Sequence, residues 1–196
     1  MKINPKHVQL IGEAAIPLLG FFLWDWSLYF ILLFYILDLF TAEVFIQIKS
    51  NRIFRHQNKG NRERKRGTLI SIIVFLALLV NIHFGMKMIA LDIDFSKEVI
   101  AFLFYEELGV PQGIILVPLI VLMSYQQYKM EFLMRASYRI IQMKSLWNSH
   151  ILPRVTMLIA SIIVIGLSLF VHLPEVVYLL AIVSFSTLYQ LLESRR

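Results

Sequence analysis

The sequence contains no cysteine and few charged residues, and both shortages narrow the class of protein. Without cysteine the chain has no disulfide, no thiolate metal ligand, no iron–sulfur cluster and no cysteine nucleophile. Charged residues make up 16% of the 196 residues and hydrophobic residues 58%, whereas a soluble domain carries roughly 25% charged residues. The mean hydropathy is +0.70. This composition indicates an integral membrane protein.

Six apolar segments are candidate membrane spans, since one crossing needs about 20 mostly apolar residues. They lie at about 8–23, 27–48, 68–90, 113–128, 151–171 and 176–192. The first segment is not read as a cleaved signal peptide, because it contains Glu13 and Pro17 and leads into Trp24-Asp25-Trp26 rather than a cleavage site. We expect one all-α domain over residues 1–196, a polytopic transmembrane helical bundle.

The distribution of charge predicts the orientation of these spans. With both termini in the cytosol, every Lys and Arg except Lys87 and Lys97 lies on the cytosolic side, and most acidic residues lie outside. This satisfies the positive-inside rule at each connection, and an odd number of spans would break the agreement. We therefore expect a multi-pass protein of the bacterial inner (cytoplasmic) membrane.

Three connections have a character of their own. A basic cytosolic loop is predicted at 49–66, where eight basic residues face the single acid Glu63. Residues 129–150 are predicted to form a basic amphipathic helix on the cytosolic leaflet, or alternatively a polar extension of the fourth span. Residues 99–105 are apolar but too short to span, so they lie in the outer interface or continue into the fourth helix.

Polar residues inside the predicted spans are the candidates for an ion or proton site. Such residues normally face the interior of a bundle, since a carboxylate near a helix centre costs about 2.5–3.5 kcal/mol on insertion scales. With Lys87 assigned to the outside and Arg154 to the cytosol, no Arg or Lys inside the membrane is evident as a partner. These carboxyl groups are therefore either structural hydrogen-bonding groups or handle protons or cations. A metal site on His83 is a weaker alternative, and we predict neither a metal nor a cofactor. The candidates are Glu13, Asp38, Glu43, Asn81 and His83.

The basic cytosolic residues are candidates for binding a partner or lipid. Basic residues beside membrane helices attract anionic lipid at about 1 kcal/mol each, and they also suit an acidic protein. We do not expect direct nucleic-acid binding, because the 49–66 segment has only Phe54 as an aromatic residue and no reader fold. The alternative reading is that these charges only fix orientation. The candidates are Arg52, Arg55, Arg62, Arg64, Lys65, Arg66, Arg135 and Arg139.

Several short motifs lie in or beside the apolar segments. They are the run Ile16 to Phe22 with Pro17 and Gly20, then Trp24, then Tyr35 followed by Asp38, then His83-Phe84-Gly85, and last Gly166 and Pro174. In these features the chain resembles an uncharacterised bacterial family of small six-span integral membrane proteins. That family usually has glutamate where this chain has Asp38, and tyrosine where it has Phe84. The resemblance implies a fold and no activity.

These patterns favour a non-enzymatic membrane anchor or sensor subunit that presents a basic cytosolic face to a partner protein or anionic lipid. By analogy with other small polytopic subunits, we expect it in a bacterial stress or defence module and as a homo-oligomer. One alternative is a proton- or cation-linked transporter or channel that uses Asp38 and Glu43. Another is an intramembrane enzyme, although no standard catalytic motif is present. No catalytic residue is assigned.

Overall fold

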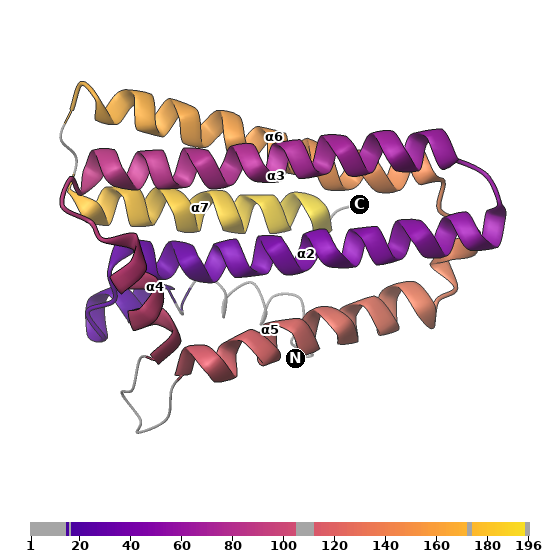
Figure 1. Ribbon diagram of the computed structural model, residues 1–196, viewed down its shortest axis with the longest axis horizontal. Coiled ribbons are helices and arrows are strands. Elements are labelled where there is room, and N and C mark those ends of the chain that lie inside the picture. Colours follow the sequence, from indigo (N-terminus) through magenta and orange to yellow (C-terminus); the bar gives the residue numbers. More distant parts are fainter. Residues whose placement is uncertain (1–14, 16, 105–111, 172–173, 195–196) are drawn as a thin grey trace, which may run out of the picture.

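The computed structural model describes residue 15 and residues 17–104, 112–171 and 174–194. These residues form helices joined by turns, without a strand among them (Figure 1). The predicted all-α class is confirmed. The described part of the first predicted span, residue 15 and residues 17–23, is helical. Glu13 lies outside the described residues.

Three helices are long and apolar enough to cross a membrane: α2 (Leu28–Gln57), α3 (Asn61–Ile89) and α6 (Met143–Ser168). The hydroxyl of Ser27 caps α2 by accepting a hydrogen bond from the backbone N–H of Phe30. α2 ends at Asn58, which adopts the left-handed conformation (φ 51°), as does Gly60 (φ 81°) before α3. Two left-handed residues within three positions reverse the chain, so α2 and α3 form an antiparallel hairpin.

The other helices are shorter. α4 (Phe95–Phe104) and α5 (Gln112–Gln127) follow α3, and α5 continues into a π-helical turn, η1 (Tyr128–Leu133). A single 3-10 turn, η2 (Ser137–Arg139), precedes α6, and α7 (Glu175–Ser194) follows it. α7 is 20 residues long and begins with the apolar stretch Glu175–Phe185. The three long helices fit a membrane protein, and the six-span arrangement stays a prediction.

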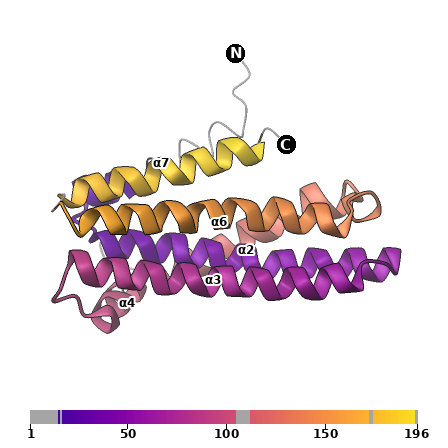
Figure 2. The same cartoon turned by 90° about the horizontal axis from the view of Figure 1, so that it is seen from above.

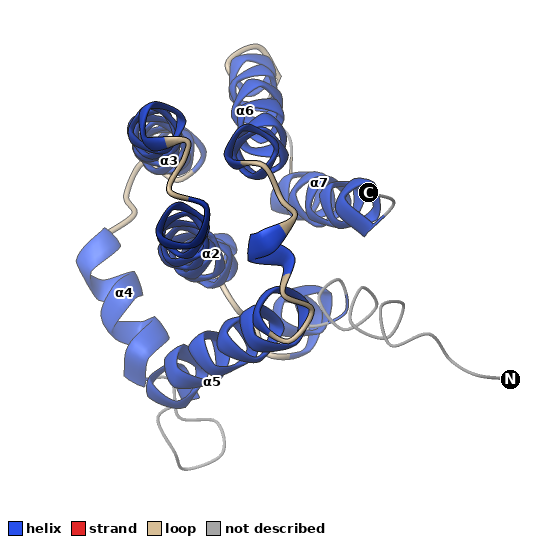
Figure 3. Ribbon diagram, turned by 90° about the vertical axis from the view of Figure 1, so that its right-hand side faces the viewer, coloured by secondary structure: helices blue, strands red, loops and turns tan. Residues whose placement is uncertain are grey.

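α2 is the central helix of the bundle, with the other helices around it (Figure 3). Two buried clusters hold the bundle together near its two ends. The cluster at the hairpin end joins α2, η1 and α6 and includes Ile53, Phe132 and Trp147. The cluster at the opposite end joins α2, α3 and α7 and includes Tyr29 and Leu179. Both ends of the bundle are therefore packed.

Two predicted connections differ from the structure. The segment 49–66 is not a loop, because α2 continues to Gln57 and α3 begins at Asn61. Residues 129–150 do not form one amphipathic helix: η1 extends α5, Ala136 breaks the helix with φ 51°, and α6 begins at Met143. The prediction of a polar extension of the fourth helix holds as far as Leu133. Residues 99–104 belong to the separate short helix α4.

A close crossing of α3 and α6 gives a prediction about stability. A Cβ atom on Gly67 would lie 2.3 Å from a ring atom of Trp147, whereas a Cβ on Gly166 meets nothing within 4 Å. We expect Gly67→Ala to destabilise the protein by about 1–3 kcal/mol through overpacking. Gly166→Ala is the matched control and is expected to be neutral or stabilising by up to about 1 kcal/mol. Unfolding in detergent measures both, and equal stabilities would contradict the close crossing.

Candidate functional site

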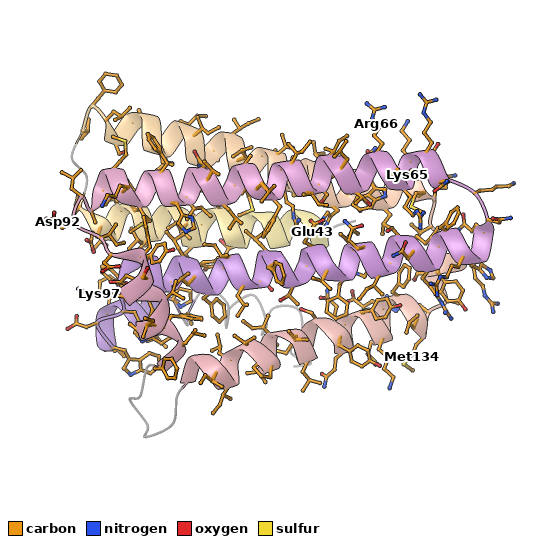
Figure 4. The ribbon with its side chains drawn as sticks, viewed as in Figure 1. Glu43, Lys65, Arg66, Asp92, Lys97 and Met134 are labelled. Atoms are coloured by element: carbon orange, nitrogen blue, oxygen red, sulfur yellow. The ribbon has the colours of Figure 1, made fainter. Side chains whose placement is uncertain are left out.

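A buried polar centre connects the three long helices. It contains Glu43 on α2, Ser71 on α3 and Arg154 on α6, whose exposed fractions are 7%, 0% and 1%. His150 on α6 and Gln47 on α2 complete it. Figure 4 shows Glu43 between the ribbons, well inside the bundle. Because charged residues are almost never fully buried without a partner, the contacts of Glu43 decide what this centre can do.

Four side chains donate to the Glu43 carboxylate. Ser71 Oγ lies 2.7 Å and His150 Nε2 3.1 Å from Oε2, and the Arg154 guanidinium forms an ion pair with the same oxygen. Gln47 Nε2 donates to Oε1 at 2.9 Å. A carboxylate has about four lone-pair sites, so these donors occupy its acceptor capacity. The arrangement therefore suits a structural ion pair better than a site that picks up and releases a cation.

The prediction that no cation pairs with the intramembrane carboxylates is wrong, because Arg154, predicted among the cytosolic charges, is buried beside Glu43. Its second guanidinium nitrogen, Nη2, donates to the backbone oxygen of Leu39 at 3.1 Å, so the side chain is held from two sides. His150 and Arg154 are four residues apart, which places both on one face of α6. The spacing of these two residues in the sequence could have predicted a polar face on α6.

The other predicted intramembrane residues do not join this centre. Asp38 lies on an exposed face of α2, about 140° around the helix from Glu43 at 100° per residue. Asn81 Nδ2 donates to Ser161 Oγ on α6 at 2.7 Å. His83 lies near the far end of α3, beside Tyr29. The structure thus separates Asp38, Glu43, Asn81 and His83 instead of bringing them together.

His83 is engaged at both ring nitrogens. Nδ1 lies 2.8 Å from the Leu79 carbonyl oxygen, which only accepts, so Nδ1 carries the proton. Nε2 then accepts from the Tyr29 hydroxyl at 2.9 Å. Neither nitrogen is open to a metal ion, and no group of three or more potential metal ligands occurs among the described residues. His83 therefore joins α2 to α3 as a packing residue.

The cationic hairpin, residues 49–66, is the second candidate site. Figure 4 places Lys65 and Arg66 at this end of the bundle and Asp92 and Lys97 at the opposite end. Six basic side chains of the hairpin are exposed, and two, Lys49 and Arg64, are half-buried. Most of the predicted basic cluster therefore lies on the surface of a helical hairpin rather than on a loop. The exposed residues are Arg52, Arg55, Lys59, Arg62, Lys65 and Arg66.

Arg64 has a different role from its neighbours. Its guanidinium donates to Asn51 Oδ1 at 2.7 Å and to Asn61 Oδ1 at 3.1 Å. The same group lies over the Phe54 ring, 4.3 Å from its centroid. Arg64 therefore ties the α3 arm of the hairpin to the α2 arm, and we assign it to hairpin structure rather than to partner binding.

The hairpin is anchored to the rest of the bundle. Gln57 Nε2 donates to the backbone oxygens of Tyr138 and Ile141, both at 3.0 Å. Ile53, which lies among the basic residues, is fully buried in the cluster at this end. These contacts hold the cationic side chains on a fixed scaffold.

The segment from η1 to the start of α6 adds to the same face. Arg135 and Arg139 are exposed, and Arg139 lies over the Tyr138 ring at 5.7 Å. Met134 and Ile140 beside them are 66% and 81% exposed. Alternating basic and exposed apolar side chains are typical of a surface that rests on a membrane interface.

Comparisons with family models, with curated proteins and with solved structures find no match to this chain. The resemblance to small six-span bacterial membrane proteins therefore stays a prediction.

Proposed function

We propose that this protein is a non-enzymatic integral membrane subunit that anchors and presents the cationic hairpin to an acidic partner protein in the cytosol. Six spans with both termini in the cytosol complete the proposed topology. Arg135 and Arg139 extend the same cationic face. The proposal rests mainly on the contacts that hold the hairpin in a fixed position on the bundle. Charges that only fixed the orientation of the spans would not need such contacts.

The length of α2 supports this placement of the hairpin. Its 30 residues extend about 45 Å at 1.5 Å per residue, whereas the hydrocarbon core is about 30 Å thick. The helix therefore extends about 15 Å past the hydrocarbon if it begins at the opposite interface. A protein surface can reach cations at that height.

The polar centre favours this function over transport. A transport route through carboxylates needs them in sequence along one path, but Asp38 and Glu43 face different sides of α2. Glu43 already has four donors. Ser71 donates to this carboxylate rather than to a histidine, unlike the serine of a Ser-His-Asp site.

The proposal is tested by purifying tagged protein from its native host in mild detergent. We expect a stoichiometric acidic cytosolic protein to accompany the wild type. We expect it to be lost when the six exposed hairpin cations are replaced by glutamine, with Arg64 retained. The matched control exchanges Arg and Lys at the same six positions, which keeps the charge, and is expected to retain most of the partner.

Orientation has to be controlled in this experiment, since removing positive charge can change topology. Ser96→Cys, on the exposed surface of α4, reports the side of the membrane in each variant. Retention of the partner by the correctly oriented glutamine variant would contradict the proposal, as would a wild-type protein that purifies without a companion.

A further inference from the structure

An apolar cavity lies between α2, α3, α6 and α7 in the half of the bundle away from the hairpin. Its volume is about 140 Å³, and Leu32, Ile82, Val164 and Ile182 are among the residues that line it. α7 diverges from α6 along its length (Figure 2). The cavity is a feature that the proposed recruitment does not use.

The residues that line the cavity extend along the helices over about the thickness of one leaflet of a bilayer. Its lining runs from Leu28 to Leu39 on α2 and from Leu78 to Ile89 on α3. At 1.5 Å per residue each stretch covers about 16 Å, which is close to half of a hydrocarbon core of about 30 Å. The lining therefore extends over the depth of one leaflet, where the hydrocarbon chains of lipids lie.

The lining favours hydrocarbon over water. A buried water needs two to four polar partners, and cavities without them stay dry. Leu, Ile, Val and Met side chains make up most of the lining. Two of its polar groups already have partners, since Asn81 Nδ2 donates to Ser161 Oγ at 2.7 Å and Ser161 Oγ donates to the Leu158 carbonyl at 2.9 Å. A dry cavity of about 150 Å³ binds an apolar molecule the size of benzene. Several methylene groups of an alkyl chain fit the same space.

A polar cleft adjoins the cavity at the end of the bundle. Leu28 and Met86 line both spaces, so the two lie next to each other. The cleft has a volume of about 500 Å³ and carries one basic residue, Lys97. Four acidic residues line it, Asp92, Asp94, Glu98 and Glu175. A cationic head group complements this charge, whereas an anionic one is repelled.

We propose that the cavity binds the single hydrocarbon chain of an amphiphile whose cationic head group lies in the adjoining cleft. This binding does not depend on the recruitment of a partner, because the two sites occupy opposite ends of the bundle. Burial of the hydrocarbon chain in the cavity favours binding, and the acidic cleft selects the cationic head group.

The test uses the full-length protein in nanodiscs and two photoreactive probes with the same diazirine-bearing twelve-carbon chain. One probe ends in a primary ammonium group and the other in a carboxylate. We expect the ammonium probe to label cavity residues saturably and several-fold more than the carboxylate probe, with the adducts mapped by mass spectrometry. Ala181→Phe, which fills the cavity lining, is expected to remove this labelling.

A second variant keeps the test independent of cavity packing. Asp92→Asn combined with Glu175→Gln changes only exposed side chains of the cleft. We expect it to lower labelling by the ammonium probe several-fold and to leave the carboxylate probe unchanged. Equal labelling by both probes in the wild type would overturn the head-group assignment. Labelling confined to exposed residues such as Leu69 and Phe84 would overturn the cavity as the binding site.

Discussion

Arg154→Met is expected to destabilise the protein by about 3–5 kcal/mol, because it leaves the Glu43 carboxylate buried without its cation. Arg154 is 1% exposed and is held by both Glu43 and the Leu39 carbonyl. Methionine keeps a long unbranched side chain in the same space, so the loss of charge pairing dominates. Unfolding by SDS titration from mixed micelles measures the change.

A double variant separates the charge from the packing. Glu43→Gln with Arg154→Met removes both charges and keeps an oxygen that accepts from Ser71 or His150. We expect it to be markedly more stable than Arg154→Met alone, because breaking one half of a buried pair costs more than replacing both halves. If the destabilisation of the double variant equals the sum of those measured for Glu43→Gln alone and Arg154→Met alone, the pair is not coupled.

Asp38→Asn is the matched control for this series. It neutralises a carboxyl group on the same helix, but on an exposed face. We expect a smaller loss of stability than for Arg154→Met, because this substitution leaves the Glu43–Arg154 ion pair intact. If Arg154→Met and Asp38→Asn unfold alike, the polar centre does not stabilise the bundle.

The sequence predicts the helical class because apolar composition and span length report contact with lipid directly. It does not locate the ends of the helices at the hairpin. Most residues of 49–57 and 61–66 are polar or basic, but they continue α2 and α3, and hydropathy cannot tell a helix outside the membrane from a loop. Ile53 and Phe54 are the apolar exceptions, and the burial of Ile53 shows what orders the hairpin.

The candidate sites were predictable to different degrees. The cationic residues follow from composition, and their exposure follows from their charge. The Glu43–Arg154 pair could not be predicted in this way, since the two residues are 111 positions apart and only the packing of α2 against α6 brings them together. The helix break at Ala136 also has no local signal, because neither glycine nor proline occurs nearby.

The side of the membrane on which the cationic hairpin lies decides between recruitment in the cytosol and any other role for it. Because the chain has no cysteine, single cysteines can be placed without background labelling. Lys59→Cys lies at the tip of the hairpin and Ser96→Cys on α4 at the opposite end, and both positions are exposed. α3 separates them, and it is long and apolar enough to cross the membrane.

The most direct measurement is labelling of these two variants with a membrane-impermeant maleimide in intact cells whose outer membrane, where present, has been permeabilised, and again after lysis. We expect Ser96→Cys to label in both conditions and Lys59→Cys only after lysis. Labelling of Lys59→Cys in cells with a sealed inner membrane would place the cationic hairpin outside the cytosol and contradict the proposed recruitment.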